Sequence, residues 1–222
     1  MVVKRSVSLK EQAYHAIRDC IVSNKMQRGQ IYSEQWFADS FQISRTPVRE
    51  ALLQFRSEGL IDVLPNRGVI LRNPTRQDAR SIFEMRGAIE GFCAAYLARR
   101  CREPEGRASL ERIKASLERC RLAFSQGDEM LIHEETIRFS GNPMFREQFD
   151  RMRTKIDIFW WNVINAENRR ESVYREHKAI FDSMAAGDEA RTYDASIRHS
   201  MATLQLLYEQ FPFADDPEIG AQ

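Results

Sequence analysis

The sequence lacks the features of several large protein classes. Of its 222 residues, 43% are hydrophobic and 29% are charged, which excludes a wholly disordered, collagen-like or coiled-coil chain. The most apolar tract, Ile156 to Ile164, contains Asp157 and Asn162 and is far shorter than a membrane span. No apolar core of signal-peptide length follows the N-terminal Met-Val-Val-Lys-Arg. We therefore expect a soluble protein with no membrane partner.

The sequence has few cysteines, and none of them is spaced as a Cys-x-x-Cys pair. The four residues are Cys20, Cys93, Cys101 and Cys120. They lie in apolar stretches with helical periodicity, where buried thiols are expected. Thiols that form no disulfide are typical of a reducing compartment, so the sequence predicts a cytoplasmic protein.

The chain has almost no net charge, because its 33 Lys and Arg residues are balanced by 32 Asp and Glu residues, for a formal charge of +1. This balance is uneven along the chain. Residues 1–76 carry twelve Lys and Arg against seven Asp and Glu, a net charge of +5, whereas the remainder carries 21 against 25, a net charge of −4. A basic N-terminal part joined to an acidic remainder indicates a nucleic-acid-binding end. An ordinary solvated surface is the alternative explanation.

Two short helices are predicted near the N-terminus. Ser8 and Glu11 have the spacing of a capping box, and apolar residues follow at helical spacing to about Asn24. Ser33 can cap a second helix that runs to about Phe41. A tight connection then leads towards a third helix, which is the order of elements in a helix-turn-helix.

The third helix and a β-hairpin complete this pattern. Thr46 fits the N-cap of the helix and Pro47 its first position, where a missing N–H costs nothing. The buried stripe of this helix is predicted to be Val48, Ala51, Leu52 and Phe55. Short β-branched runs at 60–64 and 69–72 flank a glycine-containing turn. Three helices and a hairpin predict a winged helix-turn-helix.

Asn-Pro-Thr at 73–75 interrupts the chain, and only helical patterns follow. These helices are predicted at about 77–102, 105–126, 128–140, 143–165, 171–186 and 188–211. The predicted fold class is therefore mainly α. A winged helix-turn-helix DNA-binding domain with a small β-hairpin wing occupies residues 1–74, and an antiparallel all-α bundle of six or seven helices occupies residues 75–212. A flexible tail is expected at 213–222.

The candidate DNA-binding residues lie on the third helix and at the hairpin tip. In a helix-turn-helix, the second helix of the motif enters the major groove and its N-terminal residues reach base edges. Arg45 and Arg49 are four residues apart at that end, so they share one helix face and can bind guanine or phosphate. Thr46, beside the helix N-terminus, suits a phosphate oxygen. Arg67 and Gly68 at the hairpin tip suit the minor groove.

These motifs resemble the DNA-binding domain of the GntR family of bacterial transcription regulators. The similarity covers about residues 8–74 and rests on Ser-Arg-Thr-Pro-Val-Arg-Glu-Ala-Leu at 44–52, Glu-Gly-Leu-Ile at 58–61 and Pro-Asn-Arg-Gly at 65–68. It implies binding to double-stranded operator DNA as a homodimer, through the two helix arginines and the wing Arg-Gly pair. Trp36-Phe37 departs from the usual small or aliphatic pair, which should alter packing more than groove entry.

Histidine is also scarce, and three of the four histidines lie in the helical part. His133 shares a helix face with Glu129, and His177 and His199 each belong to an inward-facing apolar stripe, whereas His15 is expected at the surface. Three imidazoles and a carboxylate can converge on one divalent metal and leave positions for water or a ligand. Zinc is favoured, and nickel, manganese and iron are the other candidates. Hydrogen-bonded core histidines are the alternative.

The helical part resembles the FCD effector domain of the fatty-acid-regulator-type branch of GntR proteins. This similarity covers roughly residues 77–210, and its motifs are Arg86-x-x-x-Glu90, His133, Ser-Gly-Asn-Pro at 140–143, Glu-His-Lys-Ala-Ile at 176–180, Gly187-Asp188 and His199. The resemblance implies that the three inward histidines bind a metal. The branch normally has Asp as its fourth ligand, where this chain has Glu129 beside Asp128. Glu129 is favoured because it lies one turn from His133.

The resemblance also implies a small carboxylate effector on the open metal positions, with Arg86 as its second anchor. An intrahelical pair with Glu90 is the alternative role for Arg86. The predicted function is therefore a non-enzymatic bacterial DNA-binding transcriptional regulator whose operator affinity changes with that acid. A metal-dependent hydrolase is one rival, but no separate general base is evident. A metal-binding helical interaction protein is the other, but paired Glu-x-x-His motifs are absent.

Overall fold

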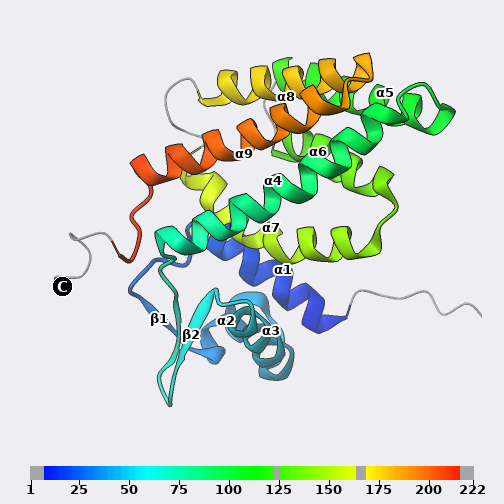
Figure 1. The fold of residues 1–222 in the computed structure, drawn as a ribbon. Coiled ribbons are helices and arrows are strands. Elements are labelled where there is room, and N and C mark those ends of the chain that lie inside the picture. The colour runs from blue at the N-terminus through cyan, green and yellow to red at the C-terminus, as the bar shows by residue number, and fades with distance from the viewer. Residues whose placement is uncertain (1–7, 123–125, 164–168, 216–222) are drawn as a thin grey trace, which may run out of the picture. The chain divides into compact units, whose positions relative to one another are not determined.

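The chain folds into two compact units, Met1–Pro74 and Thr75–Gln222, which we call the N-terminal unit and the helical unit (Figure 1). The computed structural model describes residues 8–122, 126–163 and 169–215, and the side chains of 126–128 and 160–163 fall outside this description. The predicted fold class is confirmed, because helices predominate and the small antiparallel sheet lies in the N-terminal unit. No helix in the described ranges combines the length and apolar character needed to cross a membrane.

The helices of the N-terminal unit are α1 (Leu9–Val22), α2 (Glu34–Phe41) and α3 (Arg45–Ser57). The capping box predicted for α1 is confirmed, because the Ser8 hydroxyl accepts from the Glu11 amide and the Glu11 carboxylate accepts from the Ser8 amide at 2.8 Å. The backbone N–H of Trp36 donates to the Ser33 hydroxyl at 3.0 Å, which caps α2 as predicted.

The predicted start of α3 is wrong by two residues. Ser44 is the N-cap and Thr46 lies within the first turn, although the Ser44 side chain makes no capping hydrogen bond. Pro47 then occupies the third helical position, where the backbone N–H would have no partner inside the helix in any case. A proline near a helix start therefore locates the first turn, but it does not fix which residue caps it.

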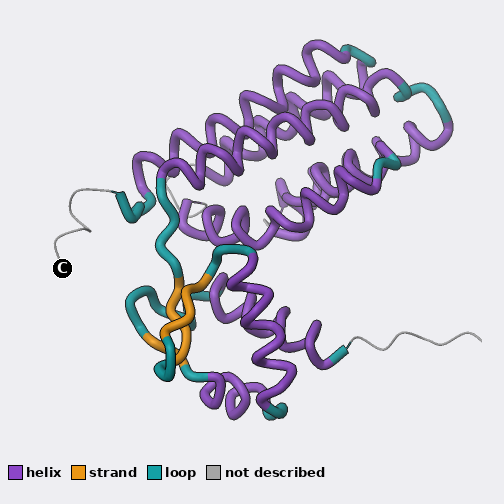
Figure 2. Tube along the Cα trace, turned by 60° about the horizontal axis from the view of Figure 1, so that its bottom comes forward, coloured by secondary structure: helices purple, strands orange, loops and turns teal. Residues whose placement is uncertain are grey.

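The described part of the N-terminal unit contains a sheet of three short strands: β1 (Ile31–Tyr32), β2 (Ile61–Leu64) and β3 (Gly68–Leu71). Their order is β1-β3-β2, and both pairs are antiparallel (orange in Figure 2). The β2–β3 hairpin is the predicted wing, with Val63 opposite Val69. The sequence predicts no strand at β1, because two residues are too few to carry an alternating pattern.

The core of the N-terminal unit forms where the three helices meet. Val48 and Phe55 on the predicted stripe of α3 are fully buried together with Phe37 of α2. Trp36 keeps 39% of its surface exposed and packs edge-on against Tyr32, with ring centroids 4.8 Å apart. The Trp-Phe pair in α2 is thus divided between the surface and the core.

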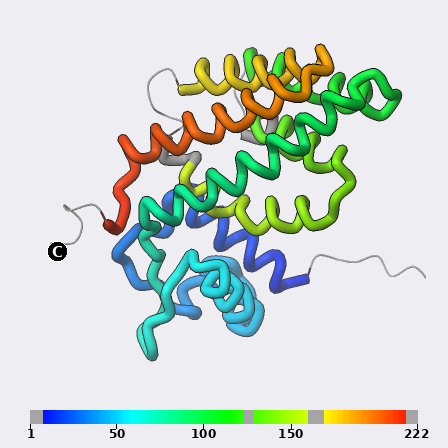
Figure 3. The backbone as a smooth tube through the Cα atoms, in the orientation of Figure 1, coloured from blue at the N-terminus to red at the C-terminus, as the bar shows by residue number. Residues whose placement is uncertain are grey.

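The described part of the helical unit contains six helices: α4 (Arg76–Arg99), α5 (Pro104–Leu122), α6 (Gln126–Ser140), α7 (Pro143–Val163), α8 (Arg169–Ala186) and α9 (Glu189–Gln210). They agree with the predicted ranges to within a few residues. A capping box between Thr75 and Asp78 starts α4 at the end of the linker, which is the Asn-Pro-Thr segment at 73–75 that joins the two units. The long helices α4 and α9 lie side by side and share the most extensive contact in the unit (Figure 3).

The end of the described chain packs into the core of the helical unit, so a tail beginning at residue 213 is wrong for 213–215. Phe213 is fully buried, and its ring centroid lies 4.8 Å from that of Phe211. The Arg76 guanidinium lies 5.3 Å from the Phe213 ring, and the Arg76 backbone N–H donates to Asp215 at 3.1 Å. The buried ring and the contacts with Arg76 together hold this segment against the helices. Residues 216–222 lie outside the described residues.

Candidate metal centre and candidate nucleic-acid interface

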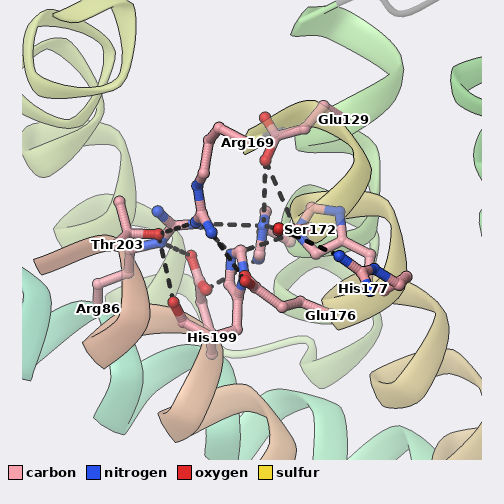
Figure 4. Close-up of polar contacts among 11 residues, drawn as sticks. Arg86, Glu129, Arg169, Ser172, Glu176, His177, His199 and Thr203 are labelled. Carbon is pink, nitrogen blue, oxygen red and sulfur yellow. Dashed lines mark hydrogen bonds and ion pairs between the residues drawn. The ribbon is translucent and has the colours of Figure 1, made fainter. Parts of the chain in front are cut away.

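The structure brings the four predicted metal-ligand residues together inside the helical unit. Glu129 and His133 come from α6, His177 from α8 and His199 from α9, and one possible ligand atom of each lies within 4.8 Å of the others. All four side chains are buried. Figure 4 shows Glu129, His177 and His199 pointing towards a common point, with Arg86 reaching it from α4. The side chain of Asp128, the alternative carboxylate, lies outside the described residues.

The imidazoles meet through the same ring atom. The Nε2 atom of His177 lies 3.1 Å from Nε2 of His133 and 3.2 Å from Nε2 of His199. The Oε1 atom of Glu129 lies 3.7 Å from Nε2 of His177 and 3.9 Å from Nε2 of His133. Three nitrogen atoms and one carboxylate oxygen therefore face one small volume, which is the donor set that borderline divalent metals prefer.

Two carboxylates fix the orientation of two histidines. Nδ1 of His133 lies 2.8 Å from Oε2 of Glu90, and Nδ1 of His199 lies 2.7 Å from Oε2 of Glu176. Each carboxylate accepts a hydrogen bond from a protonated Nδ1. The lone pair of each Nε2 is therefore directed at the centre of the cluster. The sequence does not indicate these roles for Glu90 and Glu176, although both lie in the motifs described above. The sequence offers only their positions as an indication: Glu90 lies one helical turn after Arg86, and Glu176 directly precedes His177.

Arg86 forms the intrahelical pair with Glu90 that was the alternative role for it, and it also contacts the histidine cluster. Its Nε donates to Oε1 of Glu90 at 2.8 Å, and both side chains are only 2–3% exposed. Its Nη2 lies 2.9 Å from Nε2 of His133 and 3.5 Å from Nε2 of His199. The intrahelical pair is thus present, and it holds the other edge of the guanidinium against the histidine cluster.

Burial controls the protonation of the cluster. Loss of hydration lowers the pKa of His133, His177 and His199, and the nearby Arg86 charge lowers it further. Burial also raises the pKa of Glu129 to about 8. Oε2 of Glu129 is buried without a hydrogen-bond partner among the described residues. Neutral imidazoles and a buried carboxylate whose Oε1 faces them fit a divalent cation, which would compensate the charge of that carboxylate.

A buried arginine that the sequence did not indicate supports the cluster from α8. Nη1 of Arg169 donates to Oε1 of Glu176 at 2.7 Å, and its Nη2 donates to the Thr203 hydroxyl at 2.6 Å. Arg169 is only 6% exposed. A cavity of about 190 Å³ reaches Glu129 and His177, so a small molecule has space beside the cluster.

The candidate nucleic-acid interface is an exposed surface of the N-terminal unit. Arg45, Thr46 and Arg49 of α3 and Arg67 of the wing are exposed, and Gly68 is half-buried. Both α3 arginines, Arg67 and Gly68 line one groove between the helices and the wing. The structure therefore places the predicted arginines of helix and wing on the same concave surface.

The structure shows why glycine is required at position 68. Its φ of +128° is unfavourable for other residues, and a Cβ atom there would lie 2.3 Å from the carbonyl oxygen of Tyr32. Gly68 thus allows β1 and β3 to approach each other. The sequence could not indicate this contact because β1 itself carries no pattern.

The comparisons with known proteins agree with this architecture. Residues 9–71 match the bacterial regulatory proteins of the gntR family, and residues 81–202 match the FCD domain. The gluconate operon transcriptional repressor of Bacillus subtilis is 26% identical over 211 residues, which cover 91% of this chain and 82% of that protein. An HTH-type regulator from the TAR-I ttuE-ttuC' intergenic region of Agrobacterium vitis is 38% identical over 86 residues, which cover 39% of this chain and half of that relative.

Solved structures show the same fold. E. coli McbR/YncC has a TM-score of 0.75 with this chain at 19% identity, and the match covers 93% of this chain and 100% of that one. The two family matches together span most of both units, one over the winged helix-turn-helix and one over the helical bundle. The chain therefore belongs to the GntR family of bacterial regulatory proteins, as a DNA-binding transcriptional regulator with an FCD domain.

Proposed function

We propose that this regulator changes its operator affinity when a small organic acid binds at a divalent metal in the helical unit. The observation that carries the proposal is the convergence of three imidazole Nε2 atoms and the Glu129 carboxylate within 4.8 Å. Glu129, His133, His177 and His199 would hold the metal. A bound metal would act as a Lewis acid that attracts the carboxylate of the effector.

Zinc is the favoured metal, with nickel, manganese and iron as alternatives. Neutral imidazoles suit zinc, nickel and iron, and the carboxylate is the ligand type that manganese prefers. Glu90 and Glu176 contact Nδ1 of His133 and His199. Such contacts orient metal-bound imidazoles in other proteins.

Arg86 is the proposed second anchor of the effector. Its guanidinium already faces the histidine nitrogen atoms, and bidentate pairing with a carboxylate is strong and directional. The nearby cavity of about 190 Å³ supports an acid of a few carbon atoms rather than a long acyl chain.

The proposed DNA contacts are Arg45, Thr46, Arg49, Arg67 and Gly68. The first three lie at the exposed N-terminal end of α3, from which a recognition helix reaches base edges. The wing residues share the same groove and would reach the adjacent minor groove. Effector binding would be coupled to operator binding by about 1–3 kcal/mol, the usual range for two linked sites.

We also propose that the protein acts as a homodimer through α4. Ser81, Met85, Ala88, Phe92 and Ala95 follow one another at heptad spacing on the solvent-facing side of this helix. Met85 and Phe92 are 49% and 51% exposed, which is unusual for large apolar side chains arranged in a stripe. A second copy offers the same stripe, so the two faces are self-complementary. Sedimentation of wild-type protein and a Phe92→Glu variant tests this, since the variant should be monomeric.

The central experiment measures DNA binding and metal content together. A duplex selected from a random library by the wild-type protein serves as the operator, and fluorescence anisotropy reports its Kd with zinc-loaded protein. Citrate, malate, lactate and gluconate are the probes, the last because the Bacillus subtilis relative is named for a gluconate operon. At least one acid should shift the Kd about fivefold or more, and chelation should remove the shift. An unchanged Kd with every acid, or a shift that survives chelation, contradicts the proposal.

A further inference from the structure

Glu34, at the start of α2, connects the two arginines of the candidate recognition helix. Its Oε2 lies 3.1 Å from Nη2 of Arg45, and its Oε1 lies 3.4 Å from Nε of Arg49. Each carboxylate oxygen therefore contacts a different guanidinium. The arginine side chains are 63% and 71% exposed, whereas Glu34 is 26% exposed. The acid lies beneath two side chains that remain accessible to DNA.

Stabilisation of α2 does not account for this arrangement. Glu34 is in the first turn of α2, where an acid interacts favourably with the helix dipole. The capping position is already filled, because the Ser33 hydroxyl accepts from the Trp36 amide. Both oxygen atoms of Glu34 are directed at α3 instead. Its partners in the described structure are the two arginines, which line the same groove as the wing.

Two consequences follow from a carboxylate in this place. Arg45 and Arg49 each have many rotamers when unrestrained, and a shared partner limits them to those that point along the groove. The negative charge also opposes any phosphate that approaches the two guanidinium groups. Phosphate contacts carry no sequence information, so an element that weakens them raises the difference between specific and non-specific binding.

We propose that Glu34 is a positioning residue that determines sequence specificity, by aligning Arg45 and Arg49 for base edges and by opposing their binding to phosphate. This inference rests on the proposed assignment of these arginines as DNA contacts. An unanchored arginine pair would bind DNA of any sequence more strongly and distinguish the operator less well. Glu34 therefore lowers non-specific affinity while it supports the operator complex.

The test uses Glu34→Gln, which keeps the size of the side chain but removes its charge. Glu50→Gln is the matched control, because Glu50 is an exposed acid on α3 for which the described residues provide no ion pair. Both variants raise the net charge of the same unit by one. The selected duplex and a scrambled duplex of equal composition are titrated at several salt concentrations. The Kd of the scrambled duplex divided by the Kd of the selected duplex is the specificity ratio.

Glu34→Gln should bind the scrambled duplex several-fold more tightly and lower the specificity ratio about tenfold, which is within the discrimination that one bidentate arginine supplies. Its salt dependence should steepen by about one unit in log K against log salt, as expected for one more phosphate contact. Glu50→Gln should shift the Kd of both duplexes by the same factor and leave the ratio unchanged. Circular dichroism and a thermal melt should show that both variants fold like the wild type.

Glu34→Asp separates positioning from charge. The shorter side chain keeps the negative charge but cannot span both guanidinium groups, so the ratio should fall while scrambled-duplex affinity stays near that of the wild type. Equal ratios for Glu34→Gln and Glu50→Gln would overturn the proposal. If Arg49→Ala leaves the wild-type ratio unchanged, the DNA-contact assignment itself is wrong and the inference fails with it. If only Glu34→Gln is without effect, the assignment remains and the role of Glu34 is rejected.

Discussion

The N-terminal unit and the helical unit place their arginines in opposite environments. Arg45 and Arg49 are 63% and 71% exposed, and they share a surface carboxylate. Arg86 is 2% exposed and pairs with a carboxylate that is equally buried. A surface pair contributes about 0–1 kcal/mol to folding, whereas removal of one partner of a buried pair costs about 3–5 kcal/mol. The first pair of arginines is therefore accessible from outside the protein, whereas Arg86 is enclosed in the cluster for which we propose effector binding.

Removal of the buried arginine should have the largest effect. Arg86→Ala leaves Glu90 as a buried carboxylate without its guanidinium partner, so the free energy of unfolding should fall by about 3 kcal/mol or more. Urea denaturation followed by circular dichroism measures this loss. Arg80→Ala is a matched control on the same helix, because Arg80 pairs with Glu84 at the same spacing and at 2.7 Å but is 59% exposed. Similar losses in the two variants would contradict the comparison.

Metal binding should have the next largest effect, and it should be confined to the helical unit. Zinc at about 100 times its Kd should raise the free energy of unfolding by about 2.7 kcal/mol, since the metal binds only the folded site. The double variant His177→Ala/His199→Ala should lose both this stabilisation and the zinc detected by elemental analysis. His15→Ala, which changes an exposed histidine of the N-terminal unit, should keep both. Full zinc occupancy in the double variant would reject the site.

Loss of an exposed arginine should affect DNA binding but not folding. Arg49→Ala should weaken binding to the selected duplex by about 1–3 kcal/mol and relax the base preference at one position. Lys10→Ala, which removes an exposed charge from α1, serves as the control for net charge and should leave the base preference intact. Anisotropy titrations on duplexes with single base changes measure both. An unaltered base preference in Arg49→Ala would exclude Arg49 from base recognition.

The smallest effect should be that of the surface carboxylate on stability. Glu34→Gln breaks two exposed ion pairs, so the free energy of unfolding should change by less than about 1 kcal/mol. Thermal and urea denaturation measure this change alongside the specificity ratio. A loss of several kcal/mol would indicate that the acid is needed for folding of the N-terminal unit, and the contrast between the two units would then be lost.

Much of the fold follows from local patterns in the sequence. The six helices described in the helical unit are predicted by apolar residues at helical spacing and by Pro and Gly between them, because both signals depend only on neighbours along the chain. Convergence of the histidines was predicted from the inward faces of three helices together with a family resemblance. The supporting residues Glu90, Glu176 and Arg169 were not predicted, since their contacts depend on how separate helices pack.

Three of the differences between the sequence-based expectations and the structure have a common physical origin. The two residues of β1 become a strand only through pairing with β3, and Gly68 is required only because Tyr32 lies against it. Phe213 is buried because α4 and α9 provide a place for its ring, which a short C-terminal segment does not reveal by itself. Each of these features is fixed by residues far away in the sequence. Periodicity predicts the secondary structure of a segment, but it does not predict which distant residues the segment packs against.

The start of α4 gives the linker and the candidate metal centre a shared rigid element. Thr75 caps this helix at the end of the linker, and Arg86 lies eleven residues further along it. At a rise of about 1.5 Å per residue, the two positions are about 16 Å apart along one uninterrupted helix. A twist or axial shift of α4 imposed at Arg86 would therefore reach the end of the linker without passing through a joint. A rotation of α4 by a few degrees at Arg86 would then move the residues at which the N-terminal unit is joined to this helix.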